Sequence, residues 1–292
     1  IIPPTNYARH TNIRPLGEDV HAGSPLLEGG TRLDAVALAR LASAGITRFL
    51  VRRQPRILIL TSGNELRRPG CLVPALDRKA APSNPACPKF ECDSTLLRAL
   101  LAEEGFSARV LPHLPDRRDR FLQTLRGLKP FDLLLTCGGA ANSEADHVRP
   151  ALRELGAEFL FERVRVKPAR PTALAHWRRG LVFCLPGNPV AVFAAFHAFV
   201  LPTLRAAHGH PDPAGPRFYA RLDHDFTSDP RRHLLSRVRV KRTPEGVVAS
   251  PHPESGSALL RTLIDSNGLA IIEPGDIIPR GTPVPVIWSR SP

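Results

Sequence analysis

Short apolar runs alternate with helical segments through the middle of the chain, and this alternation limits the possible folds more than any other feature. Apolar runs predict strands at residues 57–61, 108–111, 131–136, 159–164 and 181–185. Amphipathic or apolar segments predict helices at 93–104, 116–128, 143–155 and 190–204, with Asp93 or Ser94 positioned to cap the first of them. Repeated strand-helix units of this length predict an α/β fold, with a doubly wound parallel sheet covered by helices.

Two glycine turns follow strands of this predicted sheet. They are Thr136-Cys137-Gly138-Gly139 and Leu185-Pro186-Gly187-Asn188-Pro189. Glycine allows positive φ angles, and backbone N–H groups at the start of a helix attract anions. Either turn alone is explained by chain reversal, but ligands of such sheets bind beyond the carboxyl ends of the strands. Together with Ser62-Gly63-Asn64-Glu65 after the first strand, the two turns favour an oxyanion or phosphate site.

The sequence pattern changes on both sides of this α/β region. After the Pro/Gly-rich linker at 208–216, short β-prone runs at 217–222, 234–240, 246–249, 269–272 and 284–288 predict a small all-β barrel. Before it, residues 34–43 predict one amphipathic helix capped by Asp34. We therefore expect an N-terminal remnant at 1–53, an α/β domain at 54–210 and a β-barrel domain at 216–292.

The composition of the chain indicates whether it is soluble and in which compartment it works. The chain has no methionine and begins at Ile1, so we expect it to be a fragment of a longer protein. No apolar run approaches the roughly 20 residues needed to cross a bilayer, which predicts a soluble protein without a membrane partner. The five cysteines are odd in number and far apart, which favours reduced thiols and a cytoplasmic location.

The basic charge raises the question of nucleic-acid binding. The net charge is +13, but the arginines are scattered and the chain has only two Trp and two Tyr to stack on bases. A solvated basic surface is the better interpretation, and nucleic acid is not the expected partner. Motifs typical of P-loop NTPases, dinucleotide-binding domains, zinc proteases and serine hydrolases are absent from the sequence.

An ordered series of motifs resembles the molybdopterin molybdenumtransferases, the family of bacterial MoeA and the gephyrin E domain. The motifs run from near Arg14 almost to the end of the chain, and they are Gly17-Glu18-Asp19, Gly29-x-Thr31-Arg32-Leu33, Ser62-Gly63-Asn64-Glu65-Leu66, Asp93-Ser94, Cys137-Gly138-Gly139, Glu144-Ala145-Asp146, Lys167-Pro168-Ala169-Arg170-Pro171, Leu185-Pro186-Gly187-Asn188-Pro189-Val190 and Gly256-Ser257. The resemblance implies the fold just described, with a parallel sheet of the molybdopterin-binding type. It also implies an enzyme of molybdenum cofactor biosynthesis that inserts molybdate into adenylylated molybdopterin and releases AMP. Mg²⁺ is the implied cofactor and a homodimer the implied assembly.

The resemblance also implies roles for individual residues. Catalytic and Mg²⁺-binding roles fall on carboxylates, which suit a hard cation, at Glu65, Asp116 and Asp146. The residues implied to bind substrate are one further acid, the glycine turns, and basic side chains that suit phosphate or molybdate. They are Asp93, Gly138, Gly139, Arg163, Lys167, Arg170, Pro186, Gly187, Asn188 and Pro189. Within that set, Pro186 to Pro189 form the expected molybdate corner.

Several positions depart from the family pattern. Asn64 replaces a carboxylate with an amide, and residues 137–143 lose a hydroxyl and a glycine. Ala169 stands where the family has glycine, and Arg170 where it has lysine. A non-catalytic paralogue that binds molybdate, pterin or a partner protein is therefore the alternative. Molybdopterin adenylyltransferase activity is a weaker one.

Overall fold

A parallel sheet forms the centre of the α/β domain in the computed structural model, which describes residues 13–71, 89–138, 147–215, 217–244 and 246–289. Its strand order is β4-β1-β5-β9-β8-β6. The four parallel strands are β4 (Ala108–Val110), β1 (Ile57–Thr61), β5 (Leu133–Cys137) and β9 (Gly180–Leu185). The apolar runs of β1, β5 and β9 are buried on both faces, as expected for parallel strands covered by helices, whereas two of the three residues of the edge strand β4 are exposed.

The far edge of this sheet is antiparallel, which the sequence did not predict. Strand β8 (Ala173–Trp177) pairs antiparallel with β9, and β6 (Glu158–Phe161) pairs antiparallel with β8. The sequence of β8 is Ala-Leu-Ala-His-Trp, which has no β-branched residue and therefore a weak strand signal. Its pairing with β9 through a tight hairpin defines it.

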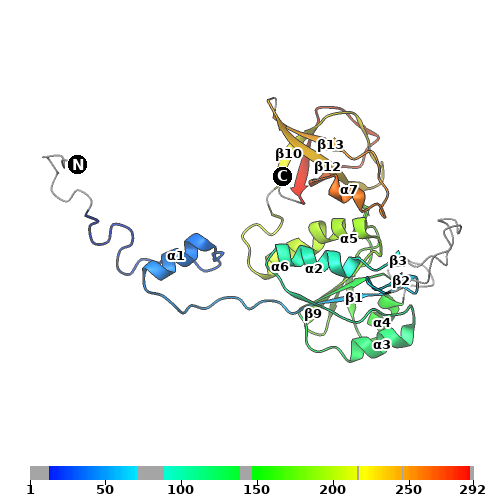
Figure 1. Cartoon of the computed structure of the whole chain (residues 1–292), viewed down its shortest axis with the longest axis horizontal. Helices are drawn as coiled ribbons and strands as arrows, with labels where there is room; N and C mark the ends of the chain where they lie inside the picture. The colour runs from blue at the N-terminus through cyan, green and yellow to red at the C-terminus, as the bar shows by residue number, and fades with distance from the viewer. Residues whose placement is uncertain (1–12, 72–88, 139–146, 216, 245, 290–292) are drawn as a thin grey trace.

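Helices cover both faces of the sheet (Figure 1). Helices α3 (Arg118–Arg126) and α4 (Val148–Glu154) pack on one face, through a core that includes Phe121, Leu125 and Leu152. Helix α2 (Asp93–Glu103) and the last helix of the domain pack on the other face, through a core that includes Leu97, Phe183 and Phe196. That second core also takes in barrel residues such as Leu235, so the barrel packs on this side of the domain.

The last helix is longer than the sequence predicted. The segments α5 (Pro189–Ala195), the π-helical turn η1 (Phe196–Val200) and α6 (Leu201–Ala207) run on as one apolar helix of 19 residues. By length and composition this helix could cross a membrane, which contradicts the expectation that no run is long enough. Most of it is buried within the structure, as in the core helix of a globular domain.

A five-stranded barrel forms the carboxyl-terminal part, as predicted. Its strands follow the order β13 (Gly246–Pro251), β10 (Arg217–Leu222), β16 (Pro283–Trp288), β14 (Gly268–Ile272) and β12 (His233–Thr243), and β13 pairs with β12 to close it. Alternating apolar side chains such as Ala220, Val238 and Val286 fill the interior. Short elements complete this part: β11 (Phe226–Thr227), β15 (Ile277–Ile278) and α7 (Arg261–Ile264).

One strand joins the two parts. Strand β7 (Val166–Lys167) pairs with β12, so residues from the predicted α/β domain extend the barrel sheet. A separate small pair, β2 (Leu66–Arg67) with β3 (Lys89–Phe90), lies beside the α/β sheet. The pairing of β7 with β12 fixes the position of Lys167 beside the barrel.

Helix α1 (Ala35–Ser43) stands apart from this body (Figure 1). The side chain of Asp34 accepts a hydrogen bond from the Ala37 N–H at 2.9 Å, which confirms the predicted cap. Leu41 is buried, but Val36 and Leu38 are exposed. The predicted apolar face is therefore only partly covered by the chain itself.

Candidate functional site

Three turns leave the carboxyl edge of the sheet side by side. Thr61, Cys137 and Leu185 occupy one row across β1, β5 and β9. The turns that begin at Ser62, Gly138 and Pro186 therefore start next to one another. The sheet also reverses its strand order at β1, which has β4 on one side and β5 on the other. Such a switch point is where α/β sheets bind their ligands.

Glycines let these turns approach more closely than side chains would permit. Gly138 has a φ of 89°, and a Cβ there would overlap the Ser62 carbonyl oxygen. A Cβ on Gly187 would lie 3.3 Å from the Gly138 Cα. The two glycine turns identified in the sequence are thus in direct contact, with the Ser62 turn packed against them. Gly139 and Asp146 lie outside the described residues.

Asn64 and Asp116 form a reciprocal pair at this edge. The Asn64 N–H donates to Asp116 Oδ2 and the Asp116 N–H donates to Asn64 Oδ1, each at 3.1 Å. The other oxygen, Asp116 Oδ1, is buried and has no hydrogen-bond partner in the part of the chain that the structure describes. Glu65 is exposed on the same turn, with Oε2 folded back toward Gly63. Two predicted carboxylates therefore reach this edge, and one of them presents a vacant acceptor.

His113 holds the first turn in place and was missed in the sequence. Its Nε2 donates to the Gly63 carbonyl oxygen at 2.9 Å, because that oxygen can only accept, and its Nδ1 shares a hydrogen bond of 2.9 Å with the Thr61 hydroxyl. No motif marks such a residue, since the bonds form only when the loop after β4 lies beside β1.

Helix α2 starts at the same edge with a different cap from the predicted one. We expected Asp93 or Ser94 to cap it, but Glu91 accepts from the Ser94 N–H at 2.7 Å and from the Ser94 hydroxyl at 2.5 Å. Asp93 is the first helical residue, and its Oδ1 is buried without a hydrogen-bond partner among the described residues. Freed from capping, Asp93 is a second acid with a vacant acceptor.

Burial sets the protonation of Asp93. Removal from water, with a smaller effect of the nearby Glu91 carboxylate, raises the pKa of Asp93 to about 7. The same two acids also raise the pKa of the buried Cys137 thiol, although burial is the main cause there. Asp93 therefore lies close to the end of β5, where the glycine turn begins.

A cleft of about 450 Å³ lies where the α/β domain meets the barrel. It is lined by Lys167 and Pro168 together with barrel residues that include Arg237, His252 and Glu254. Of the predicted basic residues, Lys167 reaches this cleft. Arg163 and Arg170 lie on the same hairpin, which the Val164 N–H to Arg170 carbonyl bond closes at 3.0 Å, and both are exposed.

Arg237 is the cleft residue that the sequence analysis missed. It is buried, its Nη2 donates to the Glu254 carbonyl oxygen at 2.7 Å, and its Nε has no partner. Burial lowers the pKa of this guanidinium from its usual value, although it stays charged near neutrality. Strand alternation was the available signal, because Arg237 falls on the same strand face as the buried Leu235.

The cleft and the turns are connected through one barrel loop. The loop that lines the cleft at residues 251–255 continues to Ser257, whose carbonyl oxygen accepts from the Val190 N–H at 3.3 Å. Pro189 is at the start of α5, with Asn188 as its N-cap. Gly187 and Asn188 are exposed, whereas Pro186 is buried. The predicted molybdate corner is thus tied to the loop that borders the cleft.

The turn after β7 holds Ala169, which stands where the family has glycine, in a strained backbone conformation. Ala169 has a φ of 93°, a conformation that favours glycine, and its side chain is buried. Its carbonyl oxygen accepts from the Thr172 hydroxyl at 2.7 Å, which helps to hold the turn. The chain therefore keeps the turn without the glycine.

Metal-binding capacity is limited among the residues that the structure describes. Within them, no group of three or more His, Cys, Asp or Glu side chains is close enough to hold a metal ion. Two buried carboxylate oxygens, Asp93 Oδ1 and Asp116 Oδ1, nevertheless lack partners. Mg²⁺ often binds through one or two carboxylates together with substrate phosphates, so the described acids fit that cation.

Comparison with known proteins gives the family. Residues 90–206 match the family described as a probable molybdopterin binding domain, and residues 219–288 match the MoeA C-terminal region, domain IV. A protein of Pyrococcus horikoshii, described as a molybdopterin biosynthesis moeA protein, has a similar fold. The TM-score is 0.76 at 24% identity, over 94% of this chain and 64% of that one.

Curated relatives agree with these matches. Proteins named molybdopterin molybdenumtransferase are 30% identical over 282 residues in Synechococcus elongatus and 29% identical over 265 residues in Bacillus subtilis. The alignments cover 94% and 90% of this chain, but only 65% and 59% of those relatives. The chain thus spans about three-fifths of its relatives' length. By its two domains and its fold, the chain belongs to the MoeA family of molybdopterin molybdenumtransferases.

Proposed function

We propose that the chain inserts molybdate into adenylylated molybdopterin, with release of AMP, as a step of molybdenum cofactor biosynthesis. The observation that carries this proposal is the direct contact of the Ser62, Gly138 and Gly187 turns at the switch point of the sheet. Backbone N–H groups of such turns suit the phosphates of a nucleotide-linked substrate. The names of the curated relatives support the same role.

Molybdate is a dianion, and the chain offers it two kinds of donor. The turn from Pro186 to Pro189 provides the backbone at the start of a helix. The neighbouring cleft provides Lys167 and the buried Arg237, whose Nε has no partner. A buried guanidinium with a vacant N–H binds an oxyanion strongly because little water competes.

The carboxylate side chains at this edge of the sheet would bind Mg²⁺. Asp116 Oδ1 and Asp93 Oδ1 are the described carboxylate oxygens available for it, and Glu65 is exposed nearby on the Ser62 turn. The cation would neutralise negative charge on the substrate phosphates. The chain's own residues orient the site: His113 fixes the turn, and Asn64 holds Asp116.

AMP release tests the proposed reaction directly. Purified protein is incubated with adenylylated molybdopterin, molybdate and Mg²⁺, and AMP is followed by chromatography. We expect molybdate-dependent AMP release that is lost in Arg237→Met, a variant of similar length without charge. Failure to release AMP, while the Bacillus subtilis relative does so under the same conditions, would contradict the proposal.

A non-catalytic relative is the second candidate, and Asn64 is the observation that favours it. The amide cannot supply the negative charge that a carboxylate gives to a cation site. Such a protein would bind molybdate or pterin without turnover. Calorimetric binding without AMP release would identify it.

The Asn64→Asp variant distinguishes the two candidates. Both hydrogen bonds with Asp116 use the Asn64 backbone N–H and its side-chain oxygen, so both survive in the variant. We therefore expect an intact fold and tighter Mg²⁺ binding, since two facing carboxylates attract a divalent cation. If the chain is an enzyme, AMP release at low Mg²⁺ rises as well; if it is a scaffold, binding changes and turnover stays absent. Unchanged Mg²⁺ affinity in calorimetry would remove this pair from the cation site.

A homodimer is proposed on the exposed apolar side chains around α1. Val36, Leu50 and Val51 are 76%, 103% and 62% exposed on a segment that stands apart from the body. A second copy covering them would bury this surface.

Replacing Leu50 with aspartate tests that assembly. We expect sedimentation equilibrium to show a dimer for the natural sequence and a weakened one for Leu50→Asp. Ile277→Asp is the control, because Ile277 is 65% exposed on the barrel, away from α1. A monomeric natural sequence, or equal weakening by both variants, would contradict the proposed interface.

A further inference from the structure

A hollow lined by arginines lies at the edge of the α/β sheet opposite the glycine turns. Its volume is about 580 Å³, and it is lined by Arg56, Leu128, Pro130, Phe131, Arg178 and Arg179. Arg56 precedes β1, Phe131 precedes β5, and the two adjacent arginines form the tip of the β8–β9 hairpin. These are the amino-terminal ends of the parallel strands, whereas the three glycine turns follow the carboxyl ends. The hollow is therefore separate from the site described above.

Arg178 is held in an unfavourable backbone conformation. Its φ is 58°, a region where glycine or asparagine is usual and another side chain costs about 1 kcal/mol. Its Nη1 donates to the Leu128 carbonyl oxygen at 3.0 Å and its Nη2 to the Arg126 carbonyl oxygen at 3.3 Å. Its guanidinium also lies over the Trp177 ring at 4.4 Å. The hairpin thus holds a fixed guanidinium where a glycine would turn the chain at lower cost.

An apolar floor supports this hairpin. Gly180 packs so closely on Phe131 that a Cβ there would lie 2.7 Å from the ring. Phe131 in turn packs against Trp177, with ring centroids 5.8 Å apart. Leu128 and Pro130 complete the apolar lining. The hollow therefore combines arginines with a rigid apolar surface.

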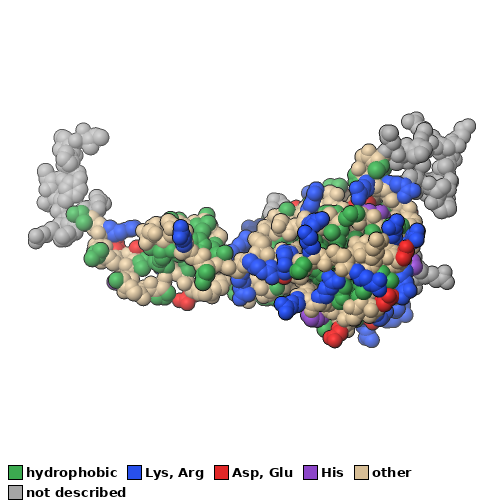
Figure 2. Space-filling model, turned by 90° about the horizontal axis from the view of Figure 1, so that it is seen from below, with side chains coloured by type: hydrophobic (Ala, Val, Ile, Leu, Met, Phe, Trp, Pro, Cys, Tyr) green, Lys and Arg blue, Asp and Glu red, His purple; other side chains and the backbone are tan. Residues whose placement is uncertain are grey.

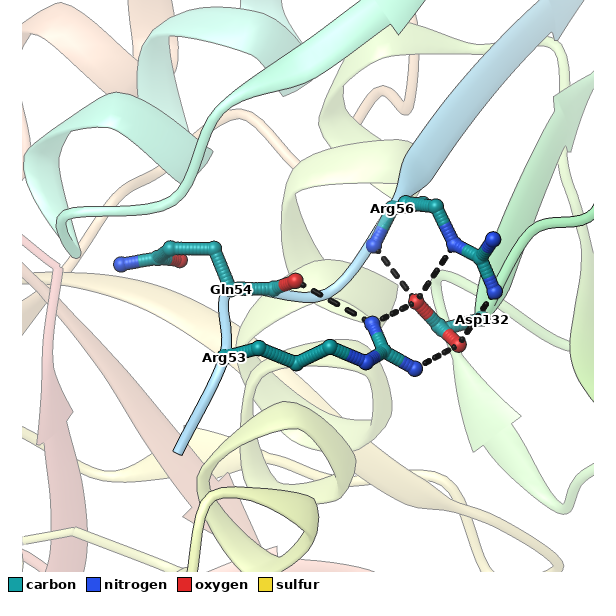
Figure 3. A network of polar contacts seen from close by, with 4 residues as sticks. All are labelled: Arg53, Gln54, Arg56 and Asp132. Carbon is teal, nitrogen blue, oxygen red and sulfur yellow. Dashed lines mark hydrogen bonds and ion pairs between the residues drawn. The ribbon is translucent and has the colours of Figure 1, made fainter. Parts of the chain in front are cut away.

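Positive charge exceeds negative charge around the hollow. Asp132 binds Arg53 at 2.6 Å and Arg56 at 3.3 Å, and it also accepts from the Arg56 N–H at 2.7 Å (Figure 3). These contacts, chiefly that of Arg53, hold the pKa of Asp132 well below its usual range. Arg179 forms no ion pair or hydrogen bond with the part of the chain that the structure describes. On the face of the molecule seen in Figure 2, blue basic side chains outnumber red acidic ones.

We propose that this hollow binds a small phosphate monoester with an apolar body. Arg56, Arg178 and Arg179 line the hollow, and the nearby Asp132 carboxylate is already engaged by Arg53 and Arg56, so a dianion balances the remaining positive charge better than a carboxylate ligand does. The volume is that of a small-molecule pocket, larger than inorganic phosphate requires. The apolar floor takes the body of the ligand, and Arg179 supplies the guanidinium without a partner.

Fluorescence of Trp177 provides a local readout. The chain has two tryptophans, so a Trp288→Phe background leaves the signal of Trp177, which lies beneath Arg178. Phe at 288 keeps an aromatic ring next to Phe218, which stacks on Trp288 at 4.4 Å. Phenyl phosphate is the probe, with inorganic phosphate and phenol as partial ligands. We expect saturable binding of phenyl phosphate, weaker binding of phosphate, and none of phenol.

Substitution of Arg179 tests the assignment. We expect Arg179→Ala to weaken phenyl phosphate binding about tenfold, as loss of one charge-assisted contact predicts, and Arg179→Glu to abolish it. Arg98→Glu is the matched control, because Arg98 is exposed on α2, which covers the other face of the sheet. Absence of saturable binding, equal affinity of Arg179→Ala, or equal affinity for phosphate and phenyl phosphate would overturn the proposal.

Discussion

Replacing Gly138 with alanine is expected to destabilise the α/β domain by about 2–5 kcal/mol and to abolish ligand binding at the carboxyl edge of the sheet. Two effects combine. The φ of 89° disfavours any side chain, and the new methyl group would overlap the Ser62 carbonyl oxygen. Since that oxygen belongs to the backbone, a rotamer change cannot relieve the overlap. Urea unfolding, followed by far-ultraviolet circular dichroism, measures the loss.

Gly156 provides the matched control for this experiment. Its φ is 82°, but a Cβ there would meet nothing within 4 Å. Gly156→Ala should therefore cost only the conformational penalty, about 1–2 kcal/mol. The difference between the two variants isolates the contact between the turns. Equal losses in the two variants would show that the Gly138 and Ser62 turns are not packed as described.

Replacing Asp93 with asparagine is expected to remove a pH dependence of stability. Because burial raises the pKa of Asp93 to about 7, the folded state holds a proton there that the unfolded state releases near its ordinary pKa. The stability contributed by this proton is full below about pH 4 and is lost as the pH rises to about 7. Between pH 5 and pH 8 the natural sequence should lose about 2–3 kcal/mol that Asp93→Asn retains.

Thermal unfolding at several pH values checks the sign of this effect. Asp119→Asn is the control, because Asp119 is exposed and its pKa is lowered, chiefly by a hydrogen bond from Arg117. Its contribution should be lost as the pH falls, the opposite direction from that of Asp93. Mg²⁺ adds a second readout, since a cation bound at Asp93 would lower its pKa and reduce the gain from Asp93→Asn at pH 8. A natural sequence whose stability relative to Asp93→Asn does not change with pH would refute the shifted pKa.

Much of the fold could be predicted because its signals are local. The five predicted barrel runs, the Asp34 cap and the strand at 57–61 each depend on alternation, capping or apolar runs within a few residues. Strand β8 escaped prediction because its sequence lacks β-branched residues and only pairing with β9 defines it. The cap of α2 was predicted wrongly because Glu91, which precedes the N-cap position, accepts the hydrogen bond in place of Asp93 or Ser94.

The candidate site was predicted in part. The glycine turns carry a visible signal, and the structure brings Gly138 and Gly187 together. No sequence motif marks His113 or Arg237, because each contacts residues that are distant in the sequence. His113 bonds to Thr61 and Gly63, and Arg237 bonds to Glu254 and lines the cleft.

The sequence by itself determined most of the strands and helices, the barrel and the three glycine turns, because apolar periodicity and glycine act over short distances. Tertiary structure decided which turns meet. Pairing of β1 with β5 and β5 with β9 places Ser62, Gly138 and Gly187 in contact. It also decided that Asp93 is buried, that Asn64 holds Asp116, and that Lys167 and Arg237 line the same cleft. Burial and sheet pairing create these properties, and neither exists until distant segments pack together.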